Sequence, residues 1–354
     1  MKHYKFSIQV KRVIMLTLII LPLFINKLEA KERSGEVNFT VNIEAPEDST
    51  DVRLWLPYPV SDNEQTIEDV KIDGNFSYQG VYREKETGNL ILYAEWTKPV
   101  TSERTLTFVF KASAIERVKK DFSGEKADIP VEVQEDLKGS MFLPTDGKVK
   151  DIAQSVTRWK WGVSSKARAV YDWVVENTFR DPNVKGCGLG DVEQMIVKKG
   201  GKCADISSIF VAVARAAGVP AREVFGLRLG KKDIDDITGG HHCWAEFYLP
   251  GYGWVPVDPA DVRKKMLEEG LDLKQAQKYR DYYFGAVDEY RIALARGGRG
   301  YYLSPRQKDG PINYFMYPYA EVNGKALEWL AAQKDLKYHI TFSSIKNHDA
   351  AANP

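Results

Sequence analysis

Hydrophobic and polar residues alternate through the first part of the chain. Between about residues 34 and 111 this pattern runs through VNFTVNIEA, DVRLWLPYPV, NLILYAEW and RTLTFVFKAS. Turn-rich pieces such as APEDST and KETGN separate these stretches. Alternation with a period of two places one face of a strand in a core and the other toward solvent. Short strands at such spacing predict a β-sandwich domain over residues 31–118.

The spacing of the apolar residues changes at about residue 151. In SSKARAVYDWVVENT (Ser164–Thr178) they recur at helical spacing, which predicts an amphipathic helix. GGKCADISSIFVAVARAAGVP (Gly200–Pro220) predicts a core helix that ends at Gly218, because glycine stops a helix and proline prevents its continuation. Further strands are predicted at AREVFGLRL, HHCWAEFYL, WVPVDPA, YRIALA and INYFMYPYAEV, with a charged, helix-like stretch over residues 262–283.

The N-terminus has the composition of a targeting segment. An apolar run, VIMLTLIILPLFI (Val13–Ile25), follows a start that carries four positive charges, and NKLEA follows the run. The run is short for a membrane span, which needs about 20 residues. We therefore predict a secretory signal peptide over residues 1–30, with cleavage after Ala30. The alternative is an uncleaved anchor, because Leu28 is larger than the residue usual at its position; in both cases the protein is exported, to the periplasm or the extracellular space.

Composition limits the class of protein. The chain has 354 residues, of which 44% are hydrophobic and 28% charged, and this is enough for two or three domains with real cores. The mean hydropathy of −0.38 excludes a membrane protein with several spans. A formal net charge of +1 argues against a nucleic-acid partner.

Cys203 stands in the first turn of the predicted core helix. Unpaired backbone N–H groups and the positive end of the helix dipole favour a thiolate there. Gly200 and Gly201 let the chain turn sharply and leave the sulfur approachable. This position suits a nucleophile, although an isolated cysteine is more often a small buried hydrophobic residue.

A predicted β-hairpin supplies two partners for the thiol. HHCWAEFYL and WVPVDPA flank PGYG, and a five-residue loop pairs Tyr248 with Trp254 and Trp244 with Asp258. Asp258 then lies diagonal to His242 on one face, within hydrogen-bonding reach. Acyl-transfer chemistry uses such a set: a thiol, an imidazole that takes its proton, and a carboxylate that orients the imidazole.

These residues resemble the bacterial branch of the transglutaminase-like superfamily of papain-type thiol enzymes. The resemblance covers residues 164–261 and rests on a Cys that opens a core helix, a His two residues before a Trp, and an Asp in a G-W-x-x-x-D-P strand. It implies an α+β fold, with a papain-like catalytic core over residues 150–265 after the β-sandwich and a C-terminal extension over 266–354 that packs on the core. By position, Cys203 resembles the nucleophile, His242 the base and Asp258 the orienting acid.

The resemblance implies an enzyme that forms a Cys thioester with a glutamine carboxamide or a peptide bond, resolved by water or by an amine. The substrate would be a protein or peptide, with cell-wall peptide among the candidates. Ala204 stands where the eukaryotic crosslinking enzymes carry Trp, which leaves hydrolysis and amine transfer equally open. No acidic cluster resembles a calcium loop, and we expect neither a cofactor nor a metal. Gln194 is a candidate for the second oxyanion donor.

Three alternatives stay open from the residues alone. The first is a binding or scaffold module of the same fold that has lost its chemistry. The second is a metal site, whose ligand types would come from Cys203, His241, His242, Cys243 and Asp258 but lack zinc-site spacing. The third concerns Cys187 and Cys243, which form a disulfide in an exported protein or remain buried free thiols. Alternation along the strand predicts that Cys243 points away from the His242 face.

Overall fold

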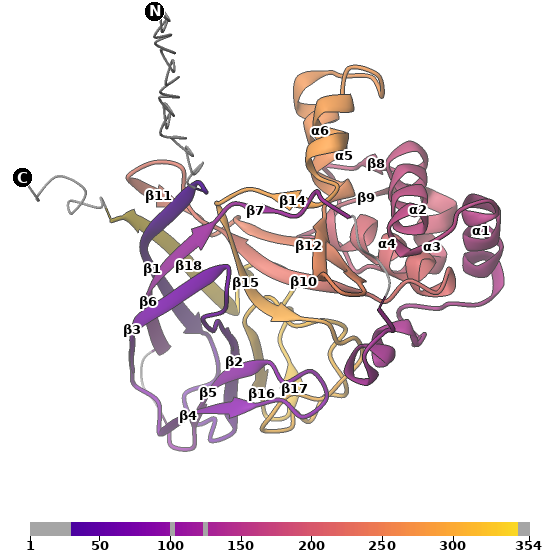
Figure 1. Cartoon of the computed structure of the whole chain (residues 1–354). Helices are drawn as coiled ribbons and strands as arrows, with labels where there is room; N and C mark the ends of the chain where they lie inside the picture. The colour runs from indigo at the N-terminus through magenta and orange to yellow at the C-terminus, as the bar shows by residue number, and fades with distance from the viewer. Residues whose placement is uncertain (1–29, 100–102, 123–126, 346–354) are drawn as a thin grey trace, which may run out of the picture.

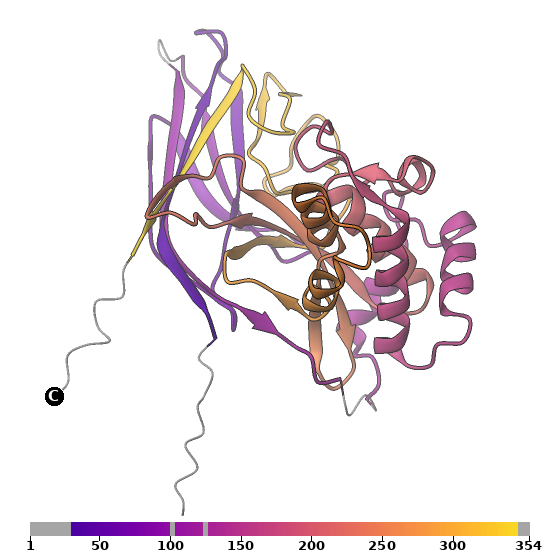
Figure 2. The same cartoon turned by 90° about the horizontal axis from the view of Figure 1, so that it is seen from above.

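The computed structural model describes residues 30–99, 103–122 and 127–345. The predicted signal peptide falls almost entirely on residues 1–29, outside the described residues. None of the helices within the described ranges has the length and apolar character needed to cross a membrane. Figures 1 and 2 show two parts side by side: paired sheets, and a smaller sheet with helices gathered against it.

The first sheet has the strand order β11-β18-β1-β6-β3. Its strands are β1 (Glu32–Ile43), β3 (Gln65–Gly74), β6 (Arg104–Ile115), β11 (Ile234–Asp236) and β18 (Leu336–Ser344). Every pairing in it is antiparallel. The predicted alternation is present along β1, where Val37, Phe39, Val41 and Ile43 are buried between more exposed neighbours.

The second sheet has the order β17-β16-β2-β5-β4. Its strands are β2 (Val52–Tyr58), β4 (Tyr78–Arg83), β5 (Leu90–Trp96), β16 (Tyr319–Val322) and β17 (Lys325–Ala326). The inward residues of both sheets share one hydrophobic core, in which the Tyr58 ring stacks on Phe108 with centroids 5.5 Å apart. Two antiparallel sheets face to face over a common core form the β-sandwich that the sequence predicts.

The C-terminal strands are part of this sandwich. β18 pairs with β1 along its length, from Gly35↔Ser344 to Ile43↔Leu336, and β16 pairs with β2. The sequence predicts that residues 266–354 pack on the catalytic core. The structure shows that this segment also completes both sheets of the sandwich, since β18 covers one edge of β1 and β16 covers one edge of β2.

The smaller sheet has the order β13-β12-β10-β15. Its strands are β10 (Ala221–Arg228), β12 (His241–Leu249), β13 (Gly253–Val257) and β15 (Arg291–Arg296). The hairpin of β12 and β13 pairs Tyr248 with Trp254 and Leu249 with Gly253, which confirms the predicted register. Short pairs complete the strands: β7 (Arg117–Val118) with β14 (Ala286–Val287), and β8 (Phe179–Arg180) with β9 (Gly200–Gly201).

Helix α4 (Cys203–Ala216) is the centre of the helical layer. It contacts β10 and β12 on one side and other helices on the other: α1 (Gly147–Thr157), α2 (Val163–Asn177), α3 (Val192–Lys198) and α5 (Pro259–Glu269). The remaining helices are the 3₁₀ helix η1 (Val131–Leu137) and α6 (Gln277–Tyr282). All residues from Cys203 to Ala214 are buried, as its apolar sequence predicts. The chain leaves the helix through Gly218, whose φ of +78° favours glycine.

Candidate active site

The start of α4 is held by a carboxylate. Asp205 accepts a hydrogen bond from the Lys202 backbone N–H at 2.9 Å and another from the Gly190 N–H at 2.8 Å. It thereby joins the first turn of α4 to the glycine-rich loop before α3. A Cβ on Gly188 would lie 1.9 Å from Asp205 Oδ2, and Gly188 has φ +87°, so this close approach requires glycine. These contacts fix the position of Cys203, the first residue of α4.

His242 and Asp258 form a buried pair. His242 Nε2 lies 2.7 Å from Asp258 Oδ2, and their exposed fractions are 4% and 0%. Asp258 also caps α5, because its Oδ1 accepts the Asp261 N–H at 2.8 Å. The carboxylate therefore belongs both to the end of the hairpin and to the start of a helix. Since Nε2 is engaged with Asp258, Nδ1 is the ring nitrogen that remains for the thiol.

Two arginines and two more carboxylates surround this pair. Arg291 Nη1 lies 2.5 Å from Asp258 Oδ2, and its Nη2 lies 2.7 Å from Asp261 Oδ2 and 2.9 Å from Asp288 Oδ2. Arg228 donates to both oxygens of Asp261 at 2.6 Å. The sequence patterns did not indicate this network. The network leaves only a weak signal in the sequence. Asp261 follows Asp258 by about one helical turn, and Arg291 lies at the start of a predicted strand.

The charges around Cys203 and His242 favour an ion pair. Burial by itself raises the pKa of the Cys203 thiol, but hydrogen bonds with Cys187, Cys243 and His242, together with the charge of His242, hold that pKa well below its ordinary value. Burial lowers the pKa of His242 and Arg228 lowers it further, yet the carboxylates of Asp258 and Asp261 outweigh both, and the net pKa is raised. A thiolate next to an imidazolium is the expected state.

All three cysteines meet at this site. Cys243 Sγ lies 3.8 Å from Cys203 Sγ, and the three sulfur atoms of Cys187, Cys203 and Cys243 lie within 4.8 Å of one another. The cysteines are free, so the Cys187–Cys243 disulfide hypothesis is wrong for this structure. Neighbouring residues of β12 face opposite ways, so Cys243 points away from the His242 face, as predicted. That face is nevertheless close to Cys203, because α4 packs on it.

The side chains of His241 and Gln194 contact residues other than the proposed catalytic ones. The His241 ring lies 4.4 Å from the Tyr317 ring, is 8% exposed, and burial lowers its pKa to about 4. Gln194 lies on the exposed side of α3, where it donates to Asp191 and accepts from Lys198. In this arrangement the Gln194 amide is engaged by Asp191 and Lys198, and its role as an oxyanion donor stays a prediction.

The ligand types considered for a metal site separate into two groups. Within the described residues, Cys187, Cys203 and Cys243 form one cluster, and His242, Asp258 and Asp261 form the other. The carboxylates of the second cluster already bind arginines, whose charges compensate theirs. The five-residue set that the sequence suggested is therefore not one site.

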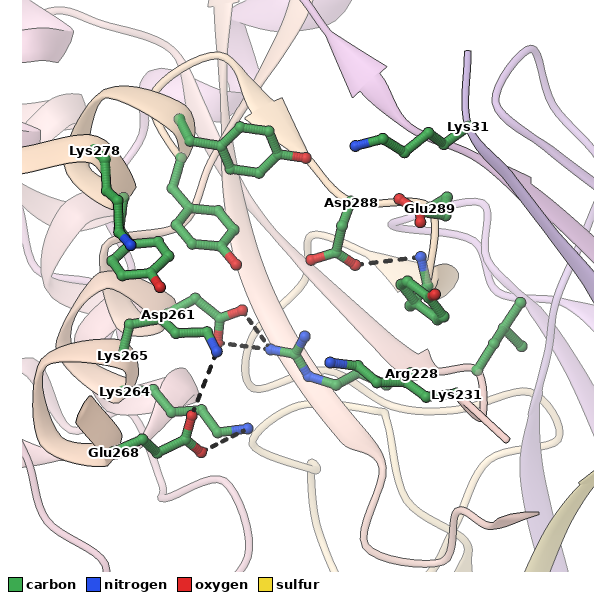
Figure 3. A pocket seen from close by; sticks show the side chains of 15 residues that line it. Lys31, Arg228, Lys231, Asp261, Lys264, Lys265, Glu268, Lys278, Asp288 and Glu289 are labelled. Atoms are coloured by element: carbon green, nitrogen blue, oxygen red, sulfur yellow. Dashed lines mark hydrogen bonds and ion pairs between the residues drawn. The ribbon is translucent and has the colours of Figure 1, made fainter. Parts of the chain in front are cut away.

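A cavity of about 580 Å³ lies on the Asp261 side of the network (Figure 3). Arg228 and Asp261 form an ion pair in its wall, and Asp288 lies opposite them. Its other cationic residues are Lys31, Lys231, Lys264, Lys265 and Lys278. Cys203 and His242 do not line it, so the cavity touches the carboxylate network and not the thiol.

Comparisons with known proteins agree with this architecture. The model of the transglutaminase-like superfamily matches residues 150–259. An uncharacterized protein of Haemophilus influenzae is 37% identical over 314 residues, which is 80% of this chain and 84% of that protein. The chain belongs to the transglutaminase-like superfamily. Its fold is α+β, with a papain-like core preceded by a β-sandwich.

Two further proteins are similar over different lengths. A protein-glutamine gamma-glutamyltransferase of Pseudomonas aeruginosa is 32% identical over 101 residues, which is 27% of this chain and 15% of that enzyme. A crystal structure from Cytophaga hutchinsonii, proposed to be a cysteine protease, has a TM-score of 0.54 at 14% identity, and covers 89% of this chain and 99% of that one. The second likeness shows that the fold extends over both parts of the chain.

Proposed function

We propose that this protein is an exported thiol enzyme in which Cys203 is the nucleophile, His242 the acid and base, and Asp258 the residue that orients His242. The observation that carries the proposal is the buried 2.7 Å contact between His242 and Asp258, next to a thiol whose pKa is held low. These are the three roles that acyl transfer through a covalent intermediate requires. Members of this superfamily act on proteins or peptides, and we propose the same substrate class.

The reaction proceeds in two steps. The Cys203 thiolate attacks the carbonyl carbon of a glutamine carboxamide or a peptide bond, and a C–S bond forms. The His242 imidazolium gives its proton to the departing nitrogen as the C–N bond breaks, which leaves a thioester. Water or an amine then attacks the thioester while neutral His242 takes its proton, and Cys203 leaves as the thiolate. The backbone N–H of Cys203 itself would be one donor to the oxyanion, since the Ala204 N–H donates to the Cys187 carbonyl at 2.9 Å.

Asp258 keeps the ring in one orientation and compensates the imidazolium. Arg291 binds the same carboxylate oxygen, so a guanidinium and the imidazole share one side of Asp258. Asp261 adds a second negative charge, with Oδ1 at 3.7 Å from His242 Nε2. The network therefore stabilises the imidazolium form of His242. His242 must be in this form to give a proton to the leaving nitrogen.

The test is a product assay with the full chain. Peptides with internal glutamine are incubated with and without a primary amine, and the products are read by mass spectrometry. Deamidation, peptide cleavage and amine incorporation each change the mass differently, so the assay separates hydrolysis of the side chain, proteolysis and transfer. Cys203→Ala is the control. If wild type forms none of these products, the protein is the scaffold module of the same fold instead.

Export is part of the proposal and rests on the basic and apolar N-terminal sequence. Expression of the full chain in a bacterial host, followed by cell fractionation and N-terminal sequencing, tests it. We expect the protein outside the cytoplasm with an N-terminus at Lys31. Retention in the cytoplasm with an intact Met1 contradicts the proposal.

A further inference from the structure

The three cysteines of this chain converge from distant positions. Cys187 lies in the glycine-rich loop before α3, Cys203 begins α4, and Cys243 is in β12. Their exposed fractions are 4%, 2% and 0%, and all three sulfur atoms lie within 4.8 Å of one another. The reaction proposed above uses one thiol. The other two enter that chemistry only through hydrogen bonds with the Cys203 sulfur.

A fourth sulfur atom adjoins the cluster. Met316 Sδ lies 3.9 Å from Cys243 Sγ. Met316 is fully buried, and the neighbouring Tyr314 and Tyr317 are at most 3% exposed. The group thus offers three thiols and one thioether in an apolar and aromatic setting.

An unpartnered imidazole lies beside the same cluster. Both ring nitrogens of His241 are buried and lack a hydrogen-bond partner of normal geometry among the described residues; the Thr238 backbone makes only a weak interaction. The Cys187 thiol donates to the His241 carbonyl at 3.3 Å. A buried polar side chain without partners is costly unless another group satisfies it.

The sulfur spacing is close to that of a coordinated metal. A tetrahedral ion with metal–sulfur bonds of about 2.3 Å separates its sulfur ligands by about 3.8 Å. Cys203 and Cys243 are already at 3.8 Å, and Cys187 needs to approach by no more than about 1 Å to match. Soft thiolate and thioether donors select Cu(I) and Zn(II) over harder ions, and a methionine donor favours Cu(I).

We propose that Cys187, Cys203 and Cys243 form a binding site for one thiophilic metal ion, with Cu(I) as the favoured ion and Met316 as an additional soft donor. Each thiol that binds releases its proton and coordinates as the thiolate. Because Cys203 is one of the ligands, the bound ion occupies the nucleophile. The consequence for activity rests on the proposed function: metal-loaded enzyme is inactive, and removal of the ion restores it.

The experiment measures binding directly. Reduced full-length protein is titrated with Cu(I) under anaerobic conditions in competition with a chromophoric Cu(I) chelator. We expect one equivalent of Cu(I) to bind. Cys187→Ser and Cys243→Ser should each weaken the binding at least about 100-fold, because loss of a partner that only supports a metal ligand already weakens binding by about 10- to 100-fold. Met316→Leu should weaken it less. Met195→Leu is the matched control, since Met195 is a buried methionine in α3 outside the cluster.

Folding and metal identity need separate measurements. Circular dichroism and thermal unfolding of each metal-free variant show whether it is folded; a variant that is not folded is replaced by the corresponding Ala substitution. X-ray absorption of the copper-loaded protein should show a sulfur-only shell. Zn(II), titrated against a zinc chelator, should bind more weakly than Cu(I).

The outcomes are distinct. Equal Cu(I) affinity in wild type, Cys187→Ser and Cys243→Ser overturns the site, and so does an oxygen or nitrogen shell in the absorption spectrum. Saturation by Zn(II) but not Cu(I) overturns the choice of ion. If Cu(I) binds through these cysteines and the metal-free protein has no acyl-transfer activity, the metal site stands and the proposed function fails. If the metal-free protein has acyl-transfer activity and no Cu(I) binding depends on these cysteines, the proposed function stands and the metal site fails.

Discussion

Nε2 of His242 and Oδ2 of Asp258 lie 2.7 Å apart in the protein interior, and the same Asp258 oxygen lies 2.5 Å from Nη1 of Arg291. The carboxylate therefore serves an imidazole and a guanidinium at once. Its removal has two effects, one on the orientation of His242 and one on the charge balance of a fully buried arginine. Substitutions at Asp258 separate the two.

We expect Asp258→Ala to unfold much more easily than wild type. It leaves the buried Arg291 with one fewer counter-charge and removes the cap of α5, and breaking a buried ion pair costs about 3–5 kcal/mol. Asp258→Asn keeps the shape and the cap, so its stability loss should be smaller while its activity falls at least about 100-fold. Urea denaturation and kcat/KM on one substrate check this. A stable Asp258→Asn with wild-type kcat/KM contradicts the orienting role.

His242 should control how the reactivity of the Cys203 thiol depends on pH. Because the pKa of Cys203 is lowered, the thiolate exists at pH values where an ordinary cysteine is protonated, and alkylation should already be fast at those pH values. In His242→Ala, the pH at which the rate reaches half its maximum should move upward. Enzymatic activity should fall on the acid side through the pKa of Cys203 and on the alkaline side through the raised pKa of His242. An unchanged alkylation profile in His242→Ala contradicts the ion pair.

Asp205 should act on the position of Cys203. It accepts two backbone N–H groups, from Lys202 and Gly190. Asp205→Ala leaves both donors without this partner, and we expect a loss of about 1–3 kcal/mol in unfolding free energy. Asp205→Asn keeps one carbonyl oxygen and should lose less. A stability of Asp205→Ala equal to that of wild type in urea denaturation shows that these two hydrogen bonds are dispensable.

Arg299 should anchor the loop that carries Cys187. It binds Glu223 through Nε and Nη2 at 2.6 and 2.5 Å, and it donates to the Leu189 carbonyl at 2.9 Å. Arg299→Met leaves Glu223 buried and uncompensated, and we expect a loss of about 3–5 kcal/mol in unfolding free energy.

The matched control is an exposed ion pair. Lys185 and Glu328 lie 3.3 Å apart, with side chains 49% and 55% exposed. Lys185→Met should change stability by less than about 1 kcal/mol. If Arg299→Met is no more destabilising than Lys185→Met, the buried pair does not hold the loop.

Local patterns predicted the elements around the site well. The alternation in HHCWAEFYL and the PGYG turn fixed the hairpin, and the observed Tyr248↔Trp254 pairing follows from them. The apolar helix after Cys203 is present and buried as predicted. These features depend on residues close together in the chain, where periodicity and turn chemistry are sufficient.

Long-range pairing was not predictable in the same way. β1 and β18 are separated by most of the chain, and no pattern in their sequences predicts that they pair. The convergence of Cys187 and Cys243 on Cys203 likewise depends on how a loop and a strand pack against α4. Strand alternation gave the correct face for each residue of β12, but it could not show on which face α4 packs.

The role of Cys203 as the nucleophile is tested by the product assay of wild type and Cys203→Ala on the same peptide substrate. Both proteins should show the same circular dichroism and closely similar thermal unfolding, because one small side chain at a helix start is lost. We expect wild type to form product and Cys203→Ala to lose at least about 10³-fold in rate, or about 4 kcal/mol of barrier stabilisation. A Cys203→Ala rate within about tenfold of wild type, a difference of only about 1.4 kcal/mol, contradicts the claim.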